Sequence, residues 1–233
     1  METATHPELT DNPGLQRSHP GYQGIYNRYV KRLIDLLLSP CLLVVALPIY
    51  AIIAAAILLE DGRPVFYRAP RGGYHGKTFQ IYKFRTMVKN ADSIGSGTTA
   101  LNDPRITGIG GFLRKTKLDE TANLLNILRG DMSFVGPRPE LLRYTRQYQG
   151  KEKEILMVRP GVTDYSSLRF ISLDEIVGAE HPDEAYEKLV LKTKNELRIQ
   201  YAESVSLKTD AHLILLTIGQ VIKKIIQTLG ARR

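Results

Sequence analysis

Residues 36–59 read LLLSPCLLVVALPIYAIIAAAILL, a run of 24 uncharged residues near the start of the chain. As one straight helix this run would be about 36 Å long, which is enough to cross the hydrocarbon core of a bilayer. It begins too far into the chain for a secretory signal peptide, and no small-residue cleavage site follows it. The run therefore predicts a helix that is associated with a membrane.

Two features of this run argue against a simple transmembrane span. Ser39-Pro40 and Pro48 lie inside it, and a proline removes a hydrogen bond and bends the helix axis. Basic residues flank the run on both sides, namely Arg28, Lys31, Arg32, Arg63, Arg68 and Arg71. Because positive charge marks the cytoplasmic side, both ends are expected there.

A re-entrant helix over residues 25–60, broken at Ser39-Pro40, satisfies both observations. Backbone groups that are exposed to lipid need hydrogen-bond partners. The hydroxyl of Ser39 could therefore bond a backbone carbonyl that the break leaves without its helical partner. Prolines are also common in membrane helices, so an ordinary kinked transmembrane helix is an equal alternative when the residues alone are considered.

The composition limits the class of protein. The 233-residue chain carries 32 Lys and Arg against 24 Asp and Glu, so its formal net charge is +8. A hydrophobic content of 43% and a mean hydropathy of −0.18 exclude a disordered chain and a polytopic membrane protein. The single cysteine, Cys41, excludes a disulfide scaffold and a zinc site of several thiolates. Nucleic acid, an anionic membrane and phosphorylated small molecules remain as partners of a basic domain.

The remaining chain predicts an α+β fold, a small and mostly helical domain with a short β-hairpin. Two apolar stretches, 65–68 and 79–85, read as strands joined by a Gly-rich turn, with Lys83 and Arg85 on one face. Apolar spacing and charged faces predict helices over about 119–129, 140–149 and 185–204, beyond a polar loop over 91–104.

The C-terminal residues 210–233 predict a basic amphipathic helix with Asp210 as its N-cap. Such a helix either packs on the domain or lies in the membrane interface. The predicted organisation, in chain order, is a flexible tail over 1–24, the membrane helix over 25–60, a cytoplasmic catalytic domain over 61–209 and the amphipathic helix over 210–233.

Candidate chemistry is concentrated between residues 83 and 140. The glycines of 108–111 fail the dinucleotide pattern, and the chain has neither a P-loop nor an Asp-x-Asp pair. Arginines clamp phosphate oxygens, while the adjacent carboxylates of Asp119-Glu120 could hold Mg²⁺ or attack phosphorus. Each element alone also has an ordinary structural explanation, as a helix-dipole contact, a rigid turn or a solvated strand face.

Taken together, four stretches resemble the bacterial sugar transferases, monotopic phosphoglycosyl transferases that begin glycan assembly on polyprenyl phosphate. They are KFRTM (83–87), RKTKLDE (114–120), NILRGDMSFVGPRPE (126–140) and RPGVT (159–163). The resemblance extends from about Tyr29 to the C-terminal helix. The family's re-entrant helix is broken at a Ser-Pro pair, so the match at Ser39-Pro40 favours the re-entrant interpretation. The chain lacks the multi-helix N-terminal region of larger members and resembles a minimal form.

This resemblance implies a two-step reaction. Asp119 would attack the sugar-bearing phosphate of a UDP-sugar and release UMP, leaving a covalent phosphosugar-aspartyl enzyme. Polyprenyl (undecaprenyl) phosphate would then accept the phosphosugar. The resemblance also implies Mg²⁺ at Asp119 and Glu120, with Glu120 assisting catalysis. The residues expected to bind the nucleotide and phosphates are Lys83, Arg85, Arg114, Pro137, Arg138 and Pro139.

The resemblance further implies a location on the cytoplasmic face of the bacterial inner membrane. The expected role is the first membrane step of exopolysaccharide, O-antigen, capsule or glycoprotein assembly, with no nucleic-acid partner and with self-association left open. Many members continue with Gly-Trp-Ala-Gln-Val-Asn-Gly-Arg where this chain has DYSSLRF (164–170), so the sugar is left unassigned. The alternative is a non-catalytic, membrane-attached basic interaction protein. That alternative does not explain the Asp119-Glu120 pair or the 136–140 stretch.

Overall fold

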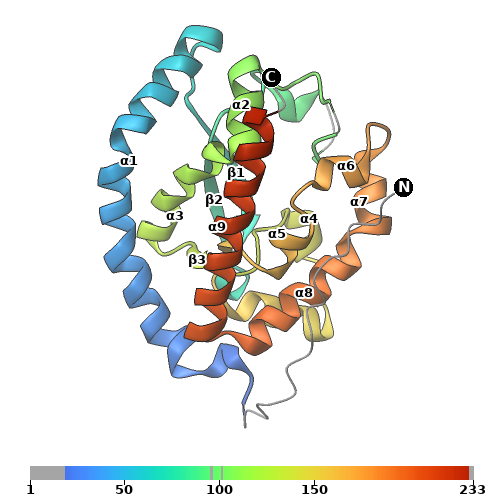
Figure 1. Ribbon diagram of the computed structural model, residues 1–233. Helices are drawn as coiled ribbons and strands as arrows, with labels where there is room; N and C mark the ends of the chain where they lie inside the picture. Colours follow the sequence, from blue (N-terminus) through green and yellow to red (C-terminus); the bar gives the residue numbers. More distant parts are fainter. Residues whose placement is uncertain (1–18, 95–96, 101, 231–233) are drawn as a thin grey trace.

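The apolar segment forms one long helix, α1 (Lys31–Asp61), which continues from a π-helical turn, η2 (Tyr26–Val30). The computed structural model describes residues 19–94, 97–100 and 102–230. Within these residues, the stretch Tyr26–Asp61 is the one helix long and apolar enough to cross a membrane, with a hydropathy of 2.9. Figure 1 shows α1 along one edge of the molecule, with the other elements on one side of it.

The helix passes through both of its prolines without interruption. Pro40 and Pro48 lie inside α1, so the expected division into two helices at Ser39-Pro40 is wrong. A single proline removes only one backbone hydrogen bond, and the bonds on either side are enough to continue the helix. The Ser39 hydroxyl is fully buried and has no hydrogen-bond partner among the described residues, so it does not bond a freed carbonyl.

Both ends of α1 are fixed to the same domain. Near its start, Lys31 forms a buried ion pair with Asp210 of α9 (Leu207–Gly230). At its end, Asp61 Oδ2 lies 3.0 Å from Arg85 Nη2. A straight helix that crossed a bilayer would carry these two ends to opposite sides, where one domain could not bind both. Both flanks of the apolar run are thus held by one domain, and their location on one side of the membrane stays a prediction.

The outer face of α1 is apolar and exposed. It includes Leu36, Leu37, Val44, Val45, Leu47, Ile52 and Leu59. The inner face carries Ile53 and Ile57, which are buried against Phe84 and Leu113 in a core cluster. One face of the helix thus belongs to the domain core while the other is left for an apolar environment.

The predicted hairpin is confirmed. β1 (Phe66–Gly72) pairs antiparallel with β2 (Thr78–Phe84), with Tyr67 opposite Lys83. Arg85 follows β2 directly, so the alternation that places Lys83 on one face of the hairpin ends one residue before it.

A second, parallel pair of strands was not predicted. β3 (Ser133–Val135) lies beside β4 (Gly161–Thr163), and three residues are too few for a readable alternation. The backbone segments around Gly136 and Arg159 approach each other closely beyond β3. A Cβ atom on Gly136 would lie 2.2 Å from the carbonyl oxygen of Arg159, so a side chain has no room there.

Helices cover these two sheets (Figure 1). In chain order they are η1 (Gly21–Gln23), η3 (Tyr74–Gly76), η4 (Ala91–Ser93), α2 (Gly108–Thr116), η5 (Leu118–Asn123), α3 (Leu124–Arg129), α4 (Leu142–Thr145), η6 (Gly150–Met157), α5 (Tyr165–Arg169), α6 (Leu173–Val177), α7 (Pro182–Leu189) and α8 (Leu191–Ser204), followed by α9. The helix expected over 119–129 is therefore a 3₁₀ turn followed by α3, and the one over 185–204 is divided into α7 and α8.

Three expected boundaries are corrected. The helix expected over 140–149 is only the four-residue α4. Asp210 is not an N-cap, because α9 begins at Leu207 and the Ser206 hydroxyl accepts the Thr209 amide at 3.2 Å. The predicted tail falls mostly on residues 1–18, outside the described residues. From Gly21, which is buried against the backbone of α8, the chain already packs on the domain.

We predict that Arg28 and Arg68, which are both exposed, lie on the same side of the membrane. Arg28→Cys and Arg68→Cys, each made after replacing the exposed Cys41 by alanine, should react with a membrane-impermeant maleimide from the cytoplasmic side only. Maleimide labelling is measured in right-side-out and in inside-out membrane vesicles, which expose opposite sides of the membrane to the reagent. Labelling of the two positions from opposite sides would establish a true span.

Candidate active site

A cavity of about 1630 Å³ lies between β2, η5, the 136–140 loop and α9. Small-molecule sites usually measure about 300–1,000 Å³, so this one is large. Most of the predicted site residues line it, namely Lys83, Arg85, Arg114, Asp119, Glu120, Arg138 and Pro139. Further basic side chains in its wall include Lys89, Arg105, Lys117 and Lys194. The cavity is therefore suited to an anionic ligand.

The two adjacent carboxylates lie on η5, the turn between α2 and α3. Lys117, which joins α2 to η5, has a left-handed backbone with φ of 59°, so the chain turns sharply just before Asp119 and Glu120. Asn126 of α3 fixes the turn against the hairpin, because its Oδ1 accepts the backbone N–H of Tyr82 at 2.9 Å. The dyad is thus built into the domain rather than carried on a mobile loop.

Glu120 is held by two cations from distant parts of the chain. Lys83 Nζ of β2 lies 3.0 Å from Oε1, and Arg138 Nη1 donates to Oε2 at 2.7 Å while its Nη2 donates to Oε1. Burial opposes ionisation of Glu120, but the charges of Arg138 and Lys83 outweigh it and hold the pKa of this carboxyl well below its usual range. Both oxygens of Glu120 are therefore already engaged.

Arg138 is itself fixed by contacts to its backbone. Arg198 of α8 donates from Nη2 to the Arg138 carbonyl at 3.1 Å, and Asp164 Oδ2 accepts the Arg138 amide at 3.4 Å. The guanidinium of Arg138 thus approaches Glu120 from a loop whose own position is determined by buried polar groups.

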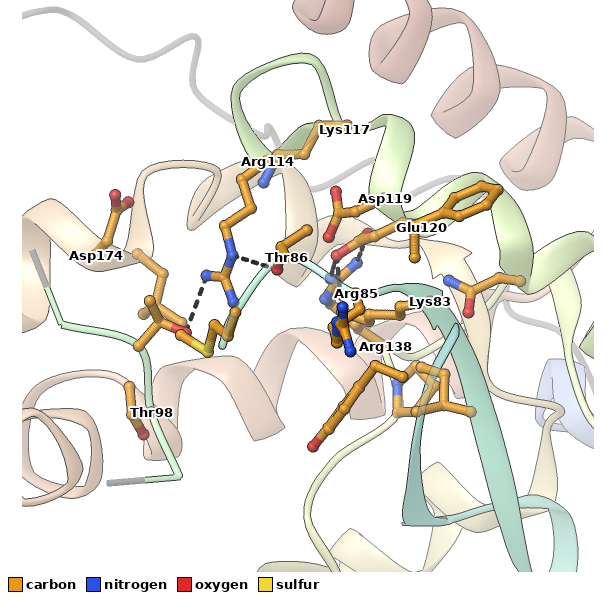
Figure 2. A pocket seen from close by; sticks show the side chains of 18 of the residues that line it. Lys83, Arg85, Thr86, Thr98, Arg114, Lys117, Asp119, Glu120, Arg138 and Asp174 are labelled. Carbon is orange, nitrogen blue, oxygen red and sulfur yellow. Dashed lines mark hydrogen bonds and ion pairs between the residues drawn. The ribbon is translucent and has the colours of Figure 1, made fainter. Parts of the chain in front are cut away.

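Asp119 is in a different state. Its side chain lines the cavity, the residue is only 6% exposed, and Oδ1 has no hydrogen-bond partner among the described residues. Burial and the neighbouring charge of Glu120 raise the pKa of Asp119, while Lys83 and Arg114 oppose that rise. Figure 2 shows Glu120 directed toward Lys83 and Arg138, with Asp119 on the side of Arg114.

Arg114 offers a cation on the other side of Asp119 (Figure 2). Its Nε donates to the Thr86 hydroxyl at 2.9 Å and its Nη1 to the Thr99 hydroxyl at 3.0 Å. Both partners are neutral, and none of the ion pairs within the described residues includes Arg114. Its charge is therefore available to a phosphate.

Two predicted phosphate-binding or nucleotide-binding residues serve mainly to hold the fold together. Arg85 lines the cavity, but its Nη2 binds Asp61 and donates to the Gly62 carbonyl at 2.7 Å, which ties α1 to β2. The Pro137 carbonyl accepts the Gly161 amide at 3.1 Å, and Pro137 lies outside the cavity wall.

The dyad fits a magnesium ion only in part. Within the part of the chain that the structure describes, no group of three or more His, Cys, Asp or Glu side chains could hold a metal. Since both oxygens of Glu120 are engaged by Lys83 and Arg138, the Asp119 carboxylate is the part of the dyad left for a cation. Mg²⁺ often takes one or two carboxylates and completes its shell with phosphate and water, so Asp119 fits such an ion.

A buried polar cluster behind the site was missed by the sequence analysis. Glu140 Oε2 accepts Arg198 Nη2 at 3.0 Å and the hydroxyl of Tyr186, and Lys194 Nζ lies 3.7 Å away. Burial opposes ionisation of Glu140, but Lys194 and Arg198 overcome it and lower the pKa of this group to about 2. Lys194 and Arg198 lie one helical turn apart, and this spacing was the one sign in the sequence that they share a helix face. The same spacing is equally typical of a solvent-exposed face.

The chain belongs to the bacterial sugar transferase family. The family model for "Bacterial sugar transferase" matches residues 26–224, which include α1, the dyad and most of α9. The resemblance carried by the four sequence stretches is thereby confirmed, and the chain is a transferase by family.

Several curated proteins are similar to it. A "UDP-glucose:undecaprenyl-phosphate glucose-1-phosphate transferase" of Escherichia coli K12 is 33% identical over 196 residues, which is 82% of this chain and 40% of that protein. "Uncharacterized sugar transferase EpsL" of Bacillus subtilis is 34% identical, and the match covers 83% of this chain and 87% of that protein. An "Undecaprenyl-phosphate galactose phosphotransferase" of Salmonella typhimurium is 38% identical, and the match covers 59% of this chain and 32% of that protein. The chain thus matches less than half the length of the Escherichia and Salmonella proteins.

We predict that Glu140→Gln lowers the free energy of unfolding by about 3 kcal/mol at neutral pH, because buried Arg198 and Lys194 lose their counter-charge. The folded pKa of Glu140, about 2, lies below its ordinary value of 4.5. Its contribution is therefore complete above pH 4.5 and is lost as the pH falls toward 2. Melting temperatures in detergent across this range should show the two proteins converging at low pH.

The matched control is Glu203→Gln, which breaks the exposed ion pair of Glu203 with Lys151. It should leave the melting temperature unchanged, because exposed ion pairs contribute little. Equal melting temperatures for wild type and Glu140→Gln at neutral pH would contradict the stabilising role of the buried cluster.

Proposed function

We propose that this protein transfers a sugar-1-phosphate from a UDP-sugar to polyprenyl (undecaprenyl) phosphate, on the cytoplasmic face of the bacterial inner membrane. The products are UMP and a polyprenyl-diphosphate sugar, and the reaction opens the assembly of a polysaccharide. The observation that carries this proposal is the Asp119 carboxylate, which lines a large cationic cavity and has an oxygen, Oδ1, without a hydrogen-bond partner among the described residues.

In the first step, a carboxylate oxygen of Asp119 attacks the phosphorus that bears the sugar. The bond from that phosphorus to the bridging oxygen breaks, UMP leaves with the oxygen, and an aspartyl phosphosugar forms. In the second step, a phosphate oxygen of the lipid attacks the same phosphorus, and the Asp119 carboxylate is restored. No general base is needed where Asp119 is ionised, the form that the charges of Lys83 and Arg114 favour.

The surrounding residues supply the charge that phosphoryl transfer requires. Arg114 is placed to bind the diphosphate, while Lys83 and Arg138 neutralise Glu120 and so limit its repulsion of the incoming anion. Burial makes Asp119 a more basic, and hence stronger, nucleophile than an exposed carboxylate. Magnesium, held by Asp119 and the substrate, would supply further neutralising charge when bound.

The cavity is large enough for a nucleotide sugar in the first step and for the lipid phosphate beside the enzyme-bound phosphosugar in the second. Its 1630 Å³ exceed the usual size of a site for one ligand. One wall is formed by Thr217, Gln220 and Val221 of α9, a helix that exposes Leu215, Ile218 and Ile222. An apolar helix surface beside the site suits an acceptor whose phosphate is polar and whose tail is lipid.

The relatives support the same substrate class, since two of their names specify undecaprenyl phosphate and either a UDP-glucose donor or transfer of galactose phosphate. These names differ in the sugar, so the donor is proposed as a class. The non-catalytic alternative is less well supported, because it requires neither an unpartnered carboxylate nor a transferase family.

We predict that Asp119, and not Glu120, carries the phosphosugar. With labelled UDP-sugar and no lipid acceptor, wild type should retain label and release about one UMP per enzyme as a burst. Asp119→Asn should give neither label nor UMP, since an amide oxygen is a poor nucleophile. Mass mapping of the labelled peptide provides the measurement.

Glu120→Gln is the matched control for this experiment. It should react slowly and still acquire label on Asp119, because Lys83 and Arg138 lose their counter-charge but the nucleophile remains. Label on Glu120, or full activity of Asp119→Asn, would overturn the assignment.

We predict that Arg114→Ala and Arg138→Ala each reduce turnover at least tenfold, about 1.4 kcal/mol of transition-state stabilisation. Arg114→Lys should recover little, because an ammonium group cannot reproduce the contacts of the guanidinium with both threonines and a phosphate. Steady-state UMP release, measured against UDP-sugar concentration, tests both. Wild-type kinetics of the alanine variants would remove these residues from the site.

A further inference from the structure

A polar side chain of α1 bonds to the turn that carries the dyad. The Tyr50 hydroxyl donates to the backbone carbonyl of Thr121 at 2.6 Å. Thr121 is the residue after Glu120 on η5, so this hydrogen bond joins the apolar helix directly to the catalytic turn. It connects positions 71 residues apart in the sequence.

The Tyr50 ring is fixed so that its hydroxyl must point at this turn. It packs edge-on against Phe84 of β2, with ring centroids 5.0 Å apart and an interplanar angle of 81°. Ile53 and Ile57, which follow on the same face of α1, are buried in the same cluster. The helix therefore approaches η5 along a packed face, and Tyr50 is the polar group of that face that bonds to it.

The turn needs such a support because its own hydrogen bonds are short-range. The Thr121 carbonyl also accepts the Leu124 amide, and the Thr121 hydroxyl bonds back to the Leu118 carbonyl at 2.7 Å. These contacts shape the turn but do not fix its distance from β2. Glu120 and Asn126 tie the segment to β2, through Lys83 and the Tyr82 amide, and Tyr50 adds a tie to α1.

We propose that Tyr50 is a positioning residue for the transfer reaction: its hydrogen bond to Thr121 holds η5 so that Asp119 faces the reacting phosphorus. The inference rests on the function proposed above. Through Tyr50 the membrane-associated helix determines the geometry of the nucleophile. An enzyme whose second substrate is a lipid would gain from this arrangement, because the helix seated in the lipid is the same element that aligns the site.

The experiment compares Tyr50→Phe with wild type in the first half-reaction, using a UDP-sugar and no lipid acceptor in detergent micelles. Rapid quenching gives the rate and the amplitude of UMP release. Tyr50→Phe keeps the ring and its packing on Phe84 and removes only the hydroxyl. The matched control is Tyr29→Phe, the same chemical change at a tyrosine that is 63% exposed on the segment preceding α1.

We expect the burst rate of Tyr50→Phe to fall about fivefold to tenfold, the size of one lost hydrogen bond that holds a reacting group in place. The burst amplitude and the UDP-sugar concentration that gives half of the maximal burst rate should stay unchanged, because the fraction of folded enzyme and the substrate contacts of Arg114 are not altered. Tyr29→Phe should behave as wild type.

Three results would overturn the inference. An unchanged burst rate in Tyr50→Phe, beside a normal wild-type burst, contradicts the role of Tyr50 alone and leaves the proposed function intact. A reduced amplitude at an unchanged rate would show that Tyr50 serves only folding. Absence of any burst from wild type would contradict the proposed function and, with it, the inference.

Discussion

The half-buried clamp on Glu120 is the interaction on which the rest of the site depends. It joins β2 through Lys83, η5 through Glu120 and the 136–140 loop through Arg138, three segments with no sequence proximity. Burying one charge alone costs several kcal/mol, so each member is stable there only when its partners are present. The clamp therefore requires the hairpin, the turn and the loop to assemble together, and the cavity is the space between them.

The same clamp gives two adjacent carboxylates different chemistry. Glu120 is saturated by charged donors, and the pKa of its carboxyl lies well below the usual range. Asp119 is also desolvated by burial, but Lys83 and Arg138 do not donate hydrogen bonds to it. Burial raises the pKa of Asp119, and the negative charge of Glu120 raises it further. Environments that separate two carboxyl groups in this way assign them separate roles. Here the engaged group is suited to organising the site, and the group with an unpartnered oxygen to reacting.

The sequence allowed the prediction of those parts of the fold that depend on local pattern. The hairpin followed from alternation around a Gly-rich turn, and the grouping of Lys83, Arg114, Asp119, Glu120 and Arg138 followed from their family motifs. Contacts between distant segments were not predictable in this way. The parallel pair β3–β4 is too short to show a period, and Arg198 reads as solvent-exposed until its burial against Glu140 is seen. The division of α1 at Ser39-Pro40 was wrong because the backbone continues its helix around the prolines.

Polar ties join the inner face of α1 to the domain at both ends and in the middle, beside the packed Ile53 and Ile57, whereas the outer face is apolar. Lys31 binds Asp210 of α9, Asp61 binds Arg85 beside β2, and Tyr50 binds the carbonyl of Thr121. Polar ties of this kind have fixed directions, unlike apolar packing, and so they fix the orientation of the helix as well as its depth. Under the proposed function, a helix seated in lipid on its outer face and bonded to η5 on its inner face would set the distance between the membrane surface and Asp119. For a reaction that passes a phosphosugar from a soluble nucleotide to a lipid, that distance is the quantity the fold has to control.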